Sequence, residues 1–333
     1  MKKNKICLLG AGRMAYDHAQ NIYESPYAEL FGIYDPLDSA AQKMSDTYQC
    51  KIYGSTKEVF SDPEIDGVAI VSPSNTHSDL ILEACDAEKG IFCEKPIDLD
   101  VRKIETCRQA LEKSKVPFLL GFNRRFDPHH SVMEERIQLG EIGSVEYIHI
   151  TSRDCPFPPL AYIKTSGGLF HDMTIHDFDM ARWLLKEEVT EVYTTGSCLI
   201  EPELQDFQDV DTACVILKTQ SGKICSITNS RRAVYGHDQR IEVFGSKGML
   251  QSENVSPTYV RKFSEDGVQT DKPLQRFLDR YKNAYKIEME HFLKDVMNGK
   301  PSKVSAFDGL QANVIADAVK ASLLESRPMK ISY

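Results

Sequence analysis

The sequence predicts two domains of different class: an α/β domain with a doubly wound parallel sheet over residues 1–121, and an α+β domain with a large, mostly antiparallel open sheet over residues 122–333. Three observations predict this division. Short apolar stretches alternate with helical stretches up to about residue 122, a glycine-rich turn follows the first of them, and later runs alternate apolar and polar residues without intervening helices. A chain of 333 residues is long enough for two domains with separate cores.

Five short apolar stretches in the first half predict the strands of the parallel sheet. They are KICLLG (5–10), ELFGIYD (29–35), GVAIVSP (67–73), GIFCEKP (90–96) and VPFLLGF (116–122). Helical stretches such as HSDLILEACDAEKG (77–90) separate them, which predicts βαβ units. Because such sheets bind ligands at the carboxyl ends of their strands, we expect the functional residues there.

A glycine-rich turn, GAGRMA (10–15), joins the first strand to the first helix. Gly10 permits the tight turn, Gly12 lets the backbone approach a pyrophosphate, and the small Ala15 allows the helix to pack closely on the strand. The second strand ends in Asp35, about 20 residues further on, where an acid can hydrogen-bond the ribose hydroxyls of a dinucleotide. No basic residue follows in PLDSA, so a 2′-phosphate would be repelled and the turn predicts NAD rather than NADP.

Two polar clusters follow later strands of the predicted sheet. One is SPSNTH (72–77) and the other is Glu94-Lys95-Pro96. Pro96 cannot continue the strand ladder, so it fixes how Lys95 leaves the sheet, near the expected position of a nicotinamide. Solvated turns and helix caps are the alternative interpretation of both clusters.

Longer runs in the second half alternate apolar and polar residues, which predicts a mostly antiparallel sheet. They are SVEYIHITSRD (144–154), VTEVYTTGSCLI (189–200), DTACVILKTQ (211–220), GKICSITNSRR (222–232) and QRIEVFGSKGML (239–250), and helices are predicted around 167–184, at 275–298 and at 305–326. Helices on one side of such a sheet leave its other face open. We therefore expect a homo-oligomer in which that face packs against another copy.

The stretch GGLFHDMTIHDFDMARWL (167–184) gathers acidic and histidine side chains where a helix is predicted to begin. The N–H groups and dipole of a helix start stabilise acids there, which accounts for one or two of them. Asp172 and His176 are four residues apart and therefore on one helical face, close to the apolar Met180 and Trp183. The pair is either a structural contact or an acid–base pair, and this pattern alone leaves both open.

Composition limits the classes of partner. A net charge of −9 without a basic block argues against nucleic acid or an anionic membrane and favours a small-molecule ligand. Nine cysteines without a C-x-x-C pair predict neither a disulfide framework nor a zinc site, and are typical of the reducing cytoplasm. No segment reaches the roughly 18 apolar residues of a membrane span. No metal is expected: His129 and His130 fit an exposed helix start, and His171 and His176 point in different directions on a helix.

Three motifs in this order resemble the glucose-fructose oxidoreductase and inositol dehydrogenase superfamily over essentially the full chain: GAGRM (10–14), Glu94-Lys95-Pro96, and two glycines followed by D-x-x-x-H-D at 172–177. GFNRRFDP (121–128), TSRDCPFPP (151–159) and SRRAVYGHDQRIEVFG (230–245) are similar to inositol dehydrogenases. The resemblance implies an NAD-binding Rossmann domain, a C-terminal domain with an open sheet, and a tetramer. It also implies NAD-dependent oxidation of a cyclic polyol to a ketone, most closely myo-inositol to 2-keto-myo-inositol (scyllo-inosose).

The resemblance also implies roles for individual residues. His176 is expected to act as the general base, Asp172 to hold that histidine or the substrate hydroxyl, and Lys95 to donate to the reacting oxygen. The cofactor-binding residues would be Gly10, Gly12, Arg13, Met14, Asp35, Ser72, Asn75, His77, Glu94 and Lys95, and the substrate-binding residues Arg124, Asp154, Asp172, His176 and Tyr235. A dehydrogenase of another polyol or sugar, such as scyllo-inositol or an aldose, is the nearest alternative. A non-catalytic regulator that senses a dinucleotide is a more distant one, because relatives of that kind have lost the catalytic lysine or histidine.

Overall fold

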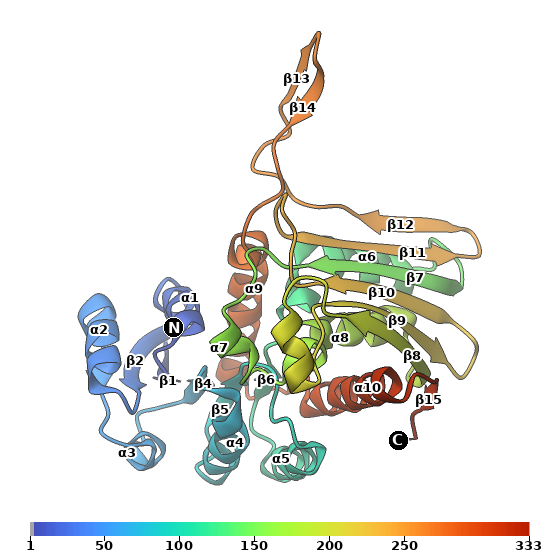
Figure 1. Ribbon diagram of the computed structural model, residues 1–333. Coiled ribbons are helices and arrows are strands. Elements are labelled where there is room, and N and C mark those ends of the chain that lie inside the picture. The colour runs from blue at the N-terminus through green and yellow to red at the C-terminus, as the bar shows by residue number, and fades with distance from the viewer. Residues whose placement is uncertain (1–2, 333) are drawn as a thin grey trace. The chain divides into compact units, whose positions relative to one another are not determined.

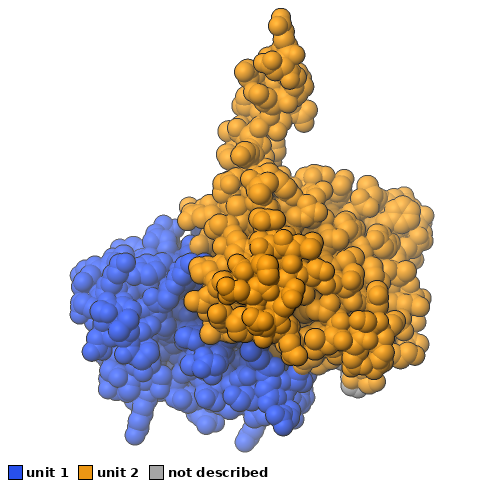
Figure 2. Space-filling model, viewed as in Figure 1, with its two compact units in different colours: residues 1–126, 283–311 blue, residues 127–282, 312–333 orange. Residues whose placement is uncertain are grey.

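A computed structural model describes residues 3–332 and divides into two compact units, coloured separately in Figure 2. The first unit is made of residues 1–126 and 283–311, and the second of residues 127–282 and 312–333. The predicted boundary after residue 121 lies near the first crossing between the units. The sequence did not indicate that residues 283–311 return to the first unit. Both later crossings fall inside long helices, α9 (Phe277–Asn298) and α10 (Ala306–Glu325).

A six-stranded parallel sheet forms the centre of the first unit, as predicted. Its strand order, β3-β2-β1-β4-β5-β6, is that of a doubly wound dinucleotide-binding sheet. The strands are β1 (Asn4–Leu9), β2 (Ala28–Tyr34), β3 (Lys51–Ile52), β4 (Gly67–Ile70), β5 (Gly90–Cys93) and β6 (Phe118–Leu120). Every residue of β4, β5 and β6 is buried, as is typical of parallel strands that are covered on both faces.

Helices connect these strands, and part of α9 completes the unit. The connecting elements are α1 (Arg13–Tyr23), α2 (Asp38–Tyr48), α3 (Thr56–Ser61), η1 (Ser74–Thr76), α4 (His77–Asp86), α5 (Val101–Ser114) and η2 (Asn123–Phe126). Asn4 Nδ2 donates to the carbonyl of Leu293 in α9 at 2.8 Å, across 289 residues of sequence. Val296 packs over Gly90, where a Cβ atom would lie only 2.6 Å from Val296 Cγ2. These contacts hold 283–311 on the first unit, and no local pattern could have predicted them.

A seven-stranded mixed sheet forms the second unit, in the order β12-β11-β7-β10-β9-β8-β15 (Figure 1). The strands are β7 (Val145–Arg153), β8 (Val189–Ser197), β9 (Thr212–Thr219), β10 (Ile224–Ser230), β11 (Asp238–Gly245), β12 (Gly248–Ser252) and β15 (Met329–Lys330). All neighbours are antiparallel except β7 and β10, which confirms the predicted mostly antiparallel sheet. The run predicted at 239–250 is two strands, because the chain reverses between Gly245 and Gly248.

Helices cover one face of this sheet. They and the shorter turns of the unit are α6 (Pro128–Gln138), α7 (Leu160–Ile163), η3 (Phe170–Thr174), α8 (Ile175–Leu185), η4 (Pro202–Phe207) and the end of α10. Met133 of α6, Phe178 of α8 and Ile315 of α10 share one apolar core with alternate residues of the strands. Large apolar side chains are exposed elsewhere on the strands: Tyr147, Tyr193, Ile216, Ile224, Phe244 and Met249.

A two-stranded arm, residues 259–270, projects from the body of the second unit (Figures 1 and 2). Its strands β13 (Arg261–Ser264) and β14 (Gly267–Thr270) pair with each other, and all eight of their residues are exposed. The sequence analysis did not predict this arm. Its alternation is too short to stand out, and an isolated hairpin has no buried face that would impose a pattern.

Candidate functional site

The predicted glycine-rich turn lies between β1 and α1, and its two glycines have different surroundings. Gly10 has φ +107°, and a Cβ atom on it would lie 2.7 Å from the backbone nitrogen of Ser72. At Gly12, in contrast, a Cβ atom would meet no described atom within 4 Å. Gly12 is also the N-cap of α1, with no side-chain cap and no acidic residue in the first turn. The turn therefore presents helix N–H groups beside open space, which suits a pyrophosphate.

Asp35 follows β2 and contacts this turn. Its Oδ2 accepts a hydrogen bond of 2.7 Å from the backbone nitrogen of Ala11, and its Oδ1 accepts one of 2.8 Å from that of Leu37. Both bonds fix the carboxylate beside the glycine-rich turn, at the carboxyl edge of the sheet. A ribose with free hydroxyls can donate to a carboxylate held in this way, whereas a 2′-phosphate would be repelled.

His77 joins the two polar clusters that follow β4 and β5. Its Nδ1 lies 2.8 Å from the carbonyl oxygen of Pro96, and its Nε2 lies 2.8 Å from that of Ser72. Burial lowers the pKa of His77, although both carbonyl contacts oppose this effect. The ring is only 1% exposed, so it sets the spacing of the two strand ends. Asn75, in the turn between them, is exposed.

Glu94 and Lys95 are half-buried, while the residues of β5 before them are fully buried. His18 Nε2 of α1 lies 2.7 Å from Glu94 Oε1, and the Lys95 backbone nitrogen donates to Glu94 Oε2 at 3.2 Å. Burial opposes ionisation of Glu94, but the hydrogen bond from His18 and the charges of His18, Lys95 and His77 lower its pKa. A carboxylate therefore stands beside the ammonium of Lys95. The Lys95–Pro96 peptide is cis.

Glu288 of α9 is a second carboxyl group near Glu94 that the sequence analysis missed. It is fully buried, and neither of its oxygens has a hydrogen-bond partner among residues 3–332. Burial, with a smaller effect from Glu94, raises the pKa of Glu288 well above its usual range. Burial therefore favours the protonated, uncharged form of Glu288. Only its spatial neighbours identify it, because its sequence position is an ordinary helical one.

In the second unit, the predicted pair lies on a mostly buried segment. Between Leu169 and Arg182 only Asp172 and His176 are half-buried, and every other residue is buried. The segment is not one regular helix as predicted: Phe170–Thr174 forms a π-helical turn, η3, which continues into α8. Such turns are frequent at functional sites. The turn and the helix together leave one carboxylate and one imidazole accessible.

Two donors hold the Asp172 carboxylate. The hydroxyl of Tyr162 in α7 donates to Oδ1 at 2.7 Å, and Nη1 of Arg231 donates to Oδ2 at 3.1 Å. The sequence analysis predicted neither contact. The Asp172–Arg231 pair spans 59 residues, and only the position of Arg231 directly after β10 brings it to the turn.

Asp154 and Tyr235 lie on the loops that follow β7 and β10. The Asp154 backbone bonds to the loop after β10, where the nitrogen of Ala233 donates to the Asp154 carbonyl at 2.7 Å. His237 Nδ1 lies 3.7 Å from Asp154 Oδ1. The Tyr235 hydroxyl donates to Asp238 and accepts a hydrogen bond of 2.8 Å from Arg153. Tyr235 thus has protein partners of its own.

Four other polar residues that the sequence singles out are Arg124, His129, His130 and His171. Arg124 is buried in η2 of the first unit. His171 pairs with Asp317 of α10 at 2.9 Å. His129 is exposed at the start of α6 as predicted, whereas His130 is fully buried. No group of three histidines, cysteines or acids that could hold a metal occurs within residues 3–332, and over the same residues no helix is long and apolar enough to cross a membrane.

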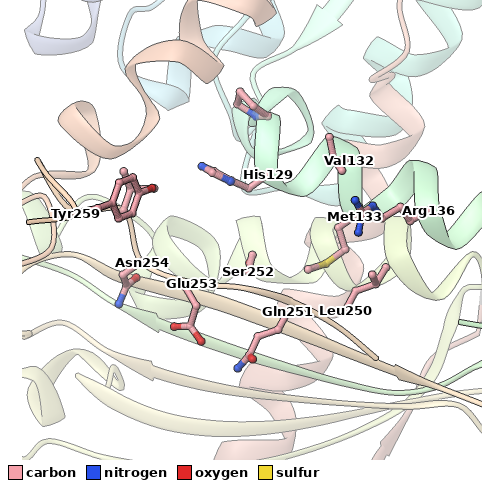
Figure 3. Close-up of a pocket in the computed structure, with 12 residues that line it drawn as sticks. His129, Val132, Met133, Arg136, Leu250, Gln251, Ser252, Glu253, Asn254 and Tyr259 are labelled. Carbon is pink, nitrogen blue, oxygen red and sulfur yellow. The ribbon is translucent and has the colours of Figure 1, made fainter. Parts of the chain in front are cut away.

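A cleft of about 480 Å³ occurs elsewhere in the second unit, between α6 and β12 (Figure 3). Its lining includes Val132, Met133, Arg136, Leu250, Glu253 and Tyr259. None of the predicted site residues lines it. The cleft and the predicted chemistry are therefore separate features of the unit.

Comparison with known proteins identifies the sequence family of both halves. Residues 4–122 match the model of an oxidoreductase family with an NAD-binding Rossmann fold, and residues 130–251 match that of the GFO/IDH/MocA C-terminal domain. The chain is 42% identical to myo-inositol 2-dehydrogenase of Thermotoga maritima over 98% of both proteins.

Solved structures give the same result. The chain superposes on a myo-inositol dehydrogenase of Corynebacterium glutamicum with a TM-score of 0.95 at 39% identity, over 100% of both chains. It also superposes on scyllo-inositol dehydrogenase of Lactobacillus casei with bound NAD(H) and scyllo-inositol, with a TM-score of 0.91 at 28% identity over 99% of both chains.

Proposed function

The chain belongs to the GFO/IDH/MocA family of oxidoreductases, and from that premise we propose that it oxidises a secondary alcohol of a cyclic polyol to a ketone with NAD, most closely myo-inositol to 2-keto-myo-inositol. The observation that carries this proposal is similarity over 98% of the chain to a myo-inositol 2-dehydrogenase. The three residues to which the family resemblance assigns the chemistry, Lys95, Asp172 and His176, are all present in this chain.

NAD, when bound, supplies the hydride acceptor. The first unit has the features that binding it requires: the open turn at Gly12, the uncapped start of α1, and the fixed carboxylate of Asp35. In the proposal Gly10, Arg13, Met14, Ser72 and Asn75 complete the cofactor site. His77 contributes indirectly, because its ring holds the ends of β4 and β5 at a fixed spacing.

Lys95 is proposed to donate to the reacting oxygen. A lysine ammonium has three protons to donate and no lone pair to accept one. A positive charge at the reacting oxygen stabilises alkoxide character as the hydride leaves.

His176 is proposed to take the hydroxyl proton, with Asp172 as its partner. An imidazole titrates near neutral pH, so it accepts and releases a proton under working conditions. An ionised Asp172 one turn earlier favours the imidazolium that forms, or accepts a hydrogen bond from the substrate hydroxyl. Arg124, Asp154 and Tyr235 are proposed to bind the other hydroxyl groups.

A neutral polyol suits this set of residues better than an anionic substrate. The proposed substrate residues combine the positive Lys95 and Arg124 with the negative Asp154 and Asp172, so their charges balance. A carboxylate or phosphate substrate would call for convergent positive charge. Hydroxyl groups both donate and accept, and therefore pair with either sign.

The test is NAD reduction by purified protein with a panel of substrates: myo-inositol, scyllo-inositol, a monodeoxy-inositol, glucose, lactate and an inositol phosphate. The proposal expects the highest kcat/KM with an inositol. A substrate that lacks one hydroxyl, and so leaves a buried protein group unpaired, should lose about 1–3 kcal/mol of binding free energy in kcat/KM. Equal or better kcat/KM with lactate or the phosphate would refute it. Scyllo-inositol is the second candidate, because the Lactobacillus casei relative binds it.

A homo-oligomer, by the family resemblance a tetramer, is proposed to form through the open sheet of the second unit. The support is the set of six large apolar side chains exposed on its strands. All nine cysteines are free thiols, which fits a reducing, cytoplasmic location. The oligomer is testable by light scattering after replacement of Phe244 and Met249 by lysine.

A further inference from the structure

Among residues 3–332, Arg231 is the largest fully buried side chain, and it contacts Asp172 of the candidate site. Its Nη1 contacts Asp172, while its Nε and Nη2 are buried without a hydrogen-bond partner among residues 3–332. A guanidinium stays charged at any working pH. Burying it with so few partners is costly, so stability alone does not explain its presence.

The segment that carries Asp172 is anchored on both sides of that residue. Before it, Asp209 Oδ1 accepts a hydrogen bond of 2.8 Å from the backbone nitrogen of Leu169. After it, Thr174 donates to the side chain of Asn229 at 3.0 Å, and Asn229 Nδ2 donates to Asp177 at 2.9 Å. These contacts fix the backbone of η3. The Asp172 carboxylate itself accepts hydrogen bonds from Tyr162 and Arg231.

Those two donors differ in charge and in exposure. Tyr162 is a neutral donor whose side chain is 43% exposed. Arg231 is cationic and fully buried, and its backbone nitrogen donates to the Asp211 carbonyl at 2.9 Å. Arg231 is therefore the buried and charged contact of Asp172. Because it has no exposed surface, it cannot itself touch a substrate.

We propose that Arg231 is a positioning residue that keeps Asp172 ionised and correctly oriented for the reaction. This inference rests on the proposed function, in which an ionised Asp172 supports His176 or accepts a substrate hydroxyl proton in a hydrogen bond. Arg231 acts only through Asp172. Its removal should lower turnover when Asp172 is present and have little further effect when the Asp172 carboxylate is absent.

The test is a double-mutant cycle of Arg231→Gln and Asp172→Asn, with kcat, KM for myo-inositol and the Kd for NAD measured in the full-length protein. Arg231→Gln should lower kcat by about 10- to 100-fold, the value of one charge-assisted hydrogen bond. In the Asp172→Asn background the same change should lower kcat by less than about threefold. Arg231→Lys keeps the charge and should recover part of the loss. NAD affinity should stay within about twofold throughout, because neither residue is in the cofactor unit.

Arg280 offers a matched control in the same unit. It is also a buried arginine paired with an aspartate, Asp127, which caps α6. Arg280→Gln should lower the thermal midpoint without changing kcat. If Arg231→Gln does not fold, Arg231→Lys carries the same cycle. If the wild type is active and the Arg231 and Asp172 substitutions lower kcat independently of each other, this inference is wrong and the proposed function still stands. An unmodified protein that oxidises no polyol would overturn the proposed function, and the inference with it.

Discussion

Alanine at Gly10 and at Gly12 should have opposite consequences, although the two glycines are only two residues apart. Gly10 has φ +107°, a region that side chains rarely adopt, and its Cβ would approach Ser72 N, Ser72 Cα and Val71 C at 2.7, 2.8 and 2.9 Å. These are backbone atoms of the next strand end, which cannot rotate away. Strain at positive φ costs about 1–3 kcal/mol, and overpacking costs about as much again. Gly10→Ala should therefore lower the free energy of unfolding by roughly 2–6 kcal/mol.

Gly12→Ala should leave the fold intact. Gly12 has φ −73° and ψ −170°, which alanine adopts freely, and apart from its chain neighbours no atom of the described part of the chain lies within 4 Å of the new methyl group. Its stability should change by less than about 1 kcal/mol. The methyl group would occupy the space through which the pyrophosphate approaches the start of α1, so NAD should bind at least about tenfold more weakly.

The assay compares both variants with the wild type by urea unfolding and by calorimetric titration with NAD. A Gly10→Ala protein with the wild-type urea midpoint would refute the argument from the Ser72 contacts. A Gly12→Ala protein that is stable but binds NAD as tightly as the wild type would refute the placement of the pyrophosphate.

The remaining predictions concern catalysis, cofactor choice and pH. Lys95→Ala and His176→Ala should each lower kcat by roughly a hundredfold or more with little change in the Kd for NAD, and near-normal turnover of either variant would remove the role assigned to that residue. Asp35→Ser should weaken the binding of NAD and raise the affinity for NADP relative to that for NAD. An unmodified protein that prefers NADP would contradict this prediction. Burial raises the pKa of Glu288 in the folded protein. Above the ordinary pKa of a glutamate the unfolded chain has released this proton while the folded protein still holds it, so the free energy of unfolding falls as the pH rises. Glu288→Gln should therefore gain at least about 1 kcal/mol over the wild type between pH 5 and pH 8. An equal difference at both pH values would show that Glu288 is already ionised in the folded protein.

The elements that depend on local pattern were predictable from the sequence. Buried parallel strands produce continuous apolar runs, and the glycine-rich turn has a fixed spacing, so both are visible without a structure. The helices predicted at 275–298 and 305–326 occur at Phe277–Asn298 and Ala306–Glu325. The half-buried positions of Asp172 and His176 follow from the apolar residues that surround them in the sequence.

The features that escaped prediction depend on contacts between distant residues. Arg231 meets Asp172 only because β10 and the π-helical turn lie together, and nothing in the local sequence says which of the two adjacent arginines, Arg231 or Arg232, is buried against an acid. The contacts of His77 were equally invisible in the sequence, because its two ring nitrogens lie at the backbone carbonyls of Pro96 and Ser72, which follow different strands. Glu288 also escaped prediction. It belongs to residues 283–311, which join the first unit although they are distant in sequence from residues 1–126.

The two units share one arrangement, in which a counter-charge lies behind a group assigned to the chemistry. In the first unit Glu94 is ionised beside Lys95 and is itself held by His18. In the second unit Arg231 is buried behind Asp172. Arg231 is fully buried whereas Asp172 is half-buried, so Arg231 can support the charge of Asp172 without competing for substrate. Each unit thus presents one charge that is already compensated by the protein. A substrate group with a net charge of its own would disturb either of these pairs, whereas a neutral hydroxyl group can hydrogen-bond without changing the local charge, which is the physical reason to expect a polyol rather than a hydroxy acid.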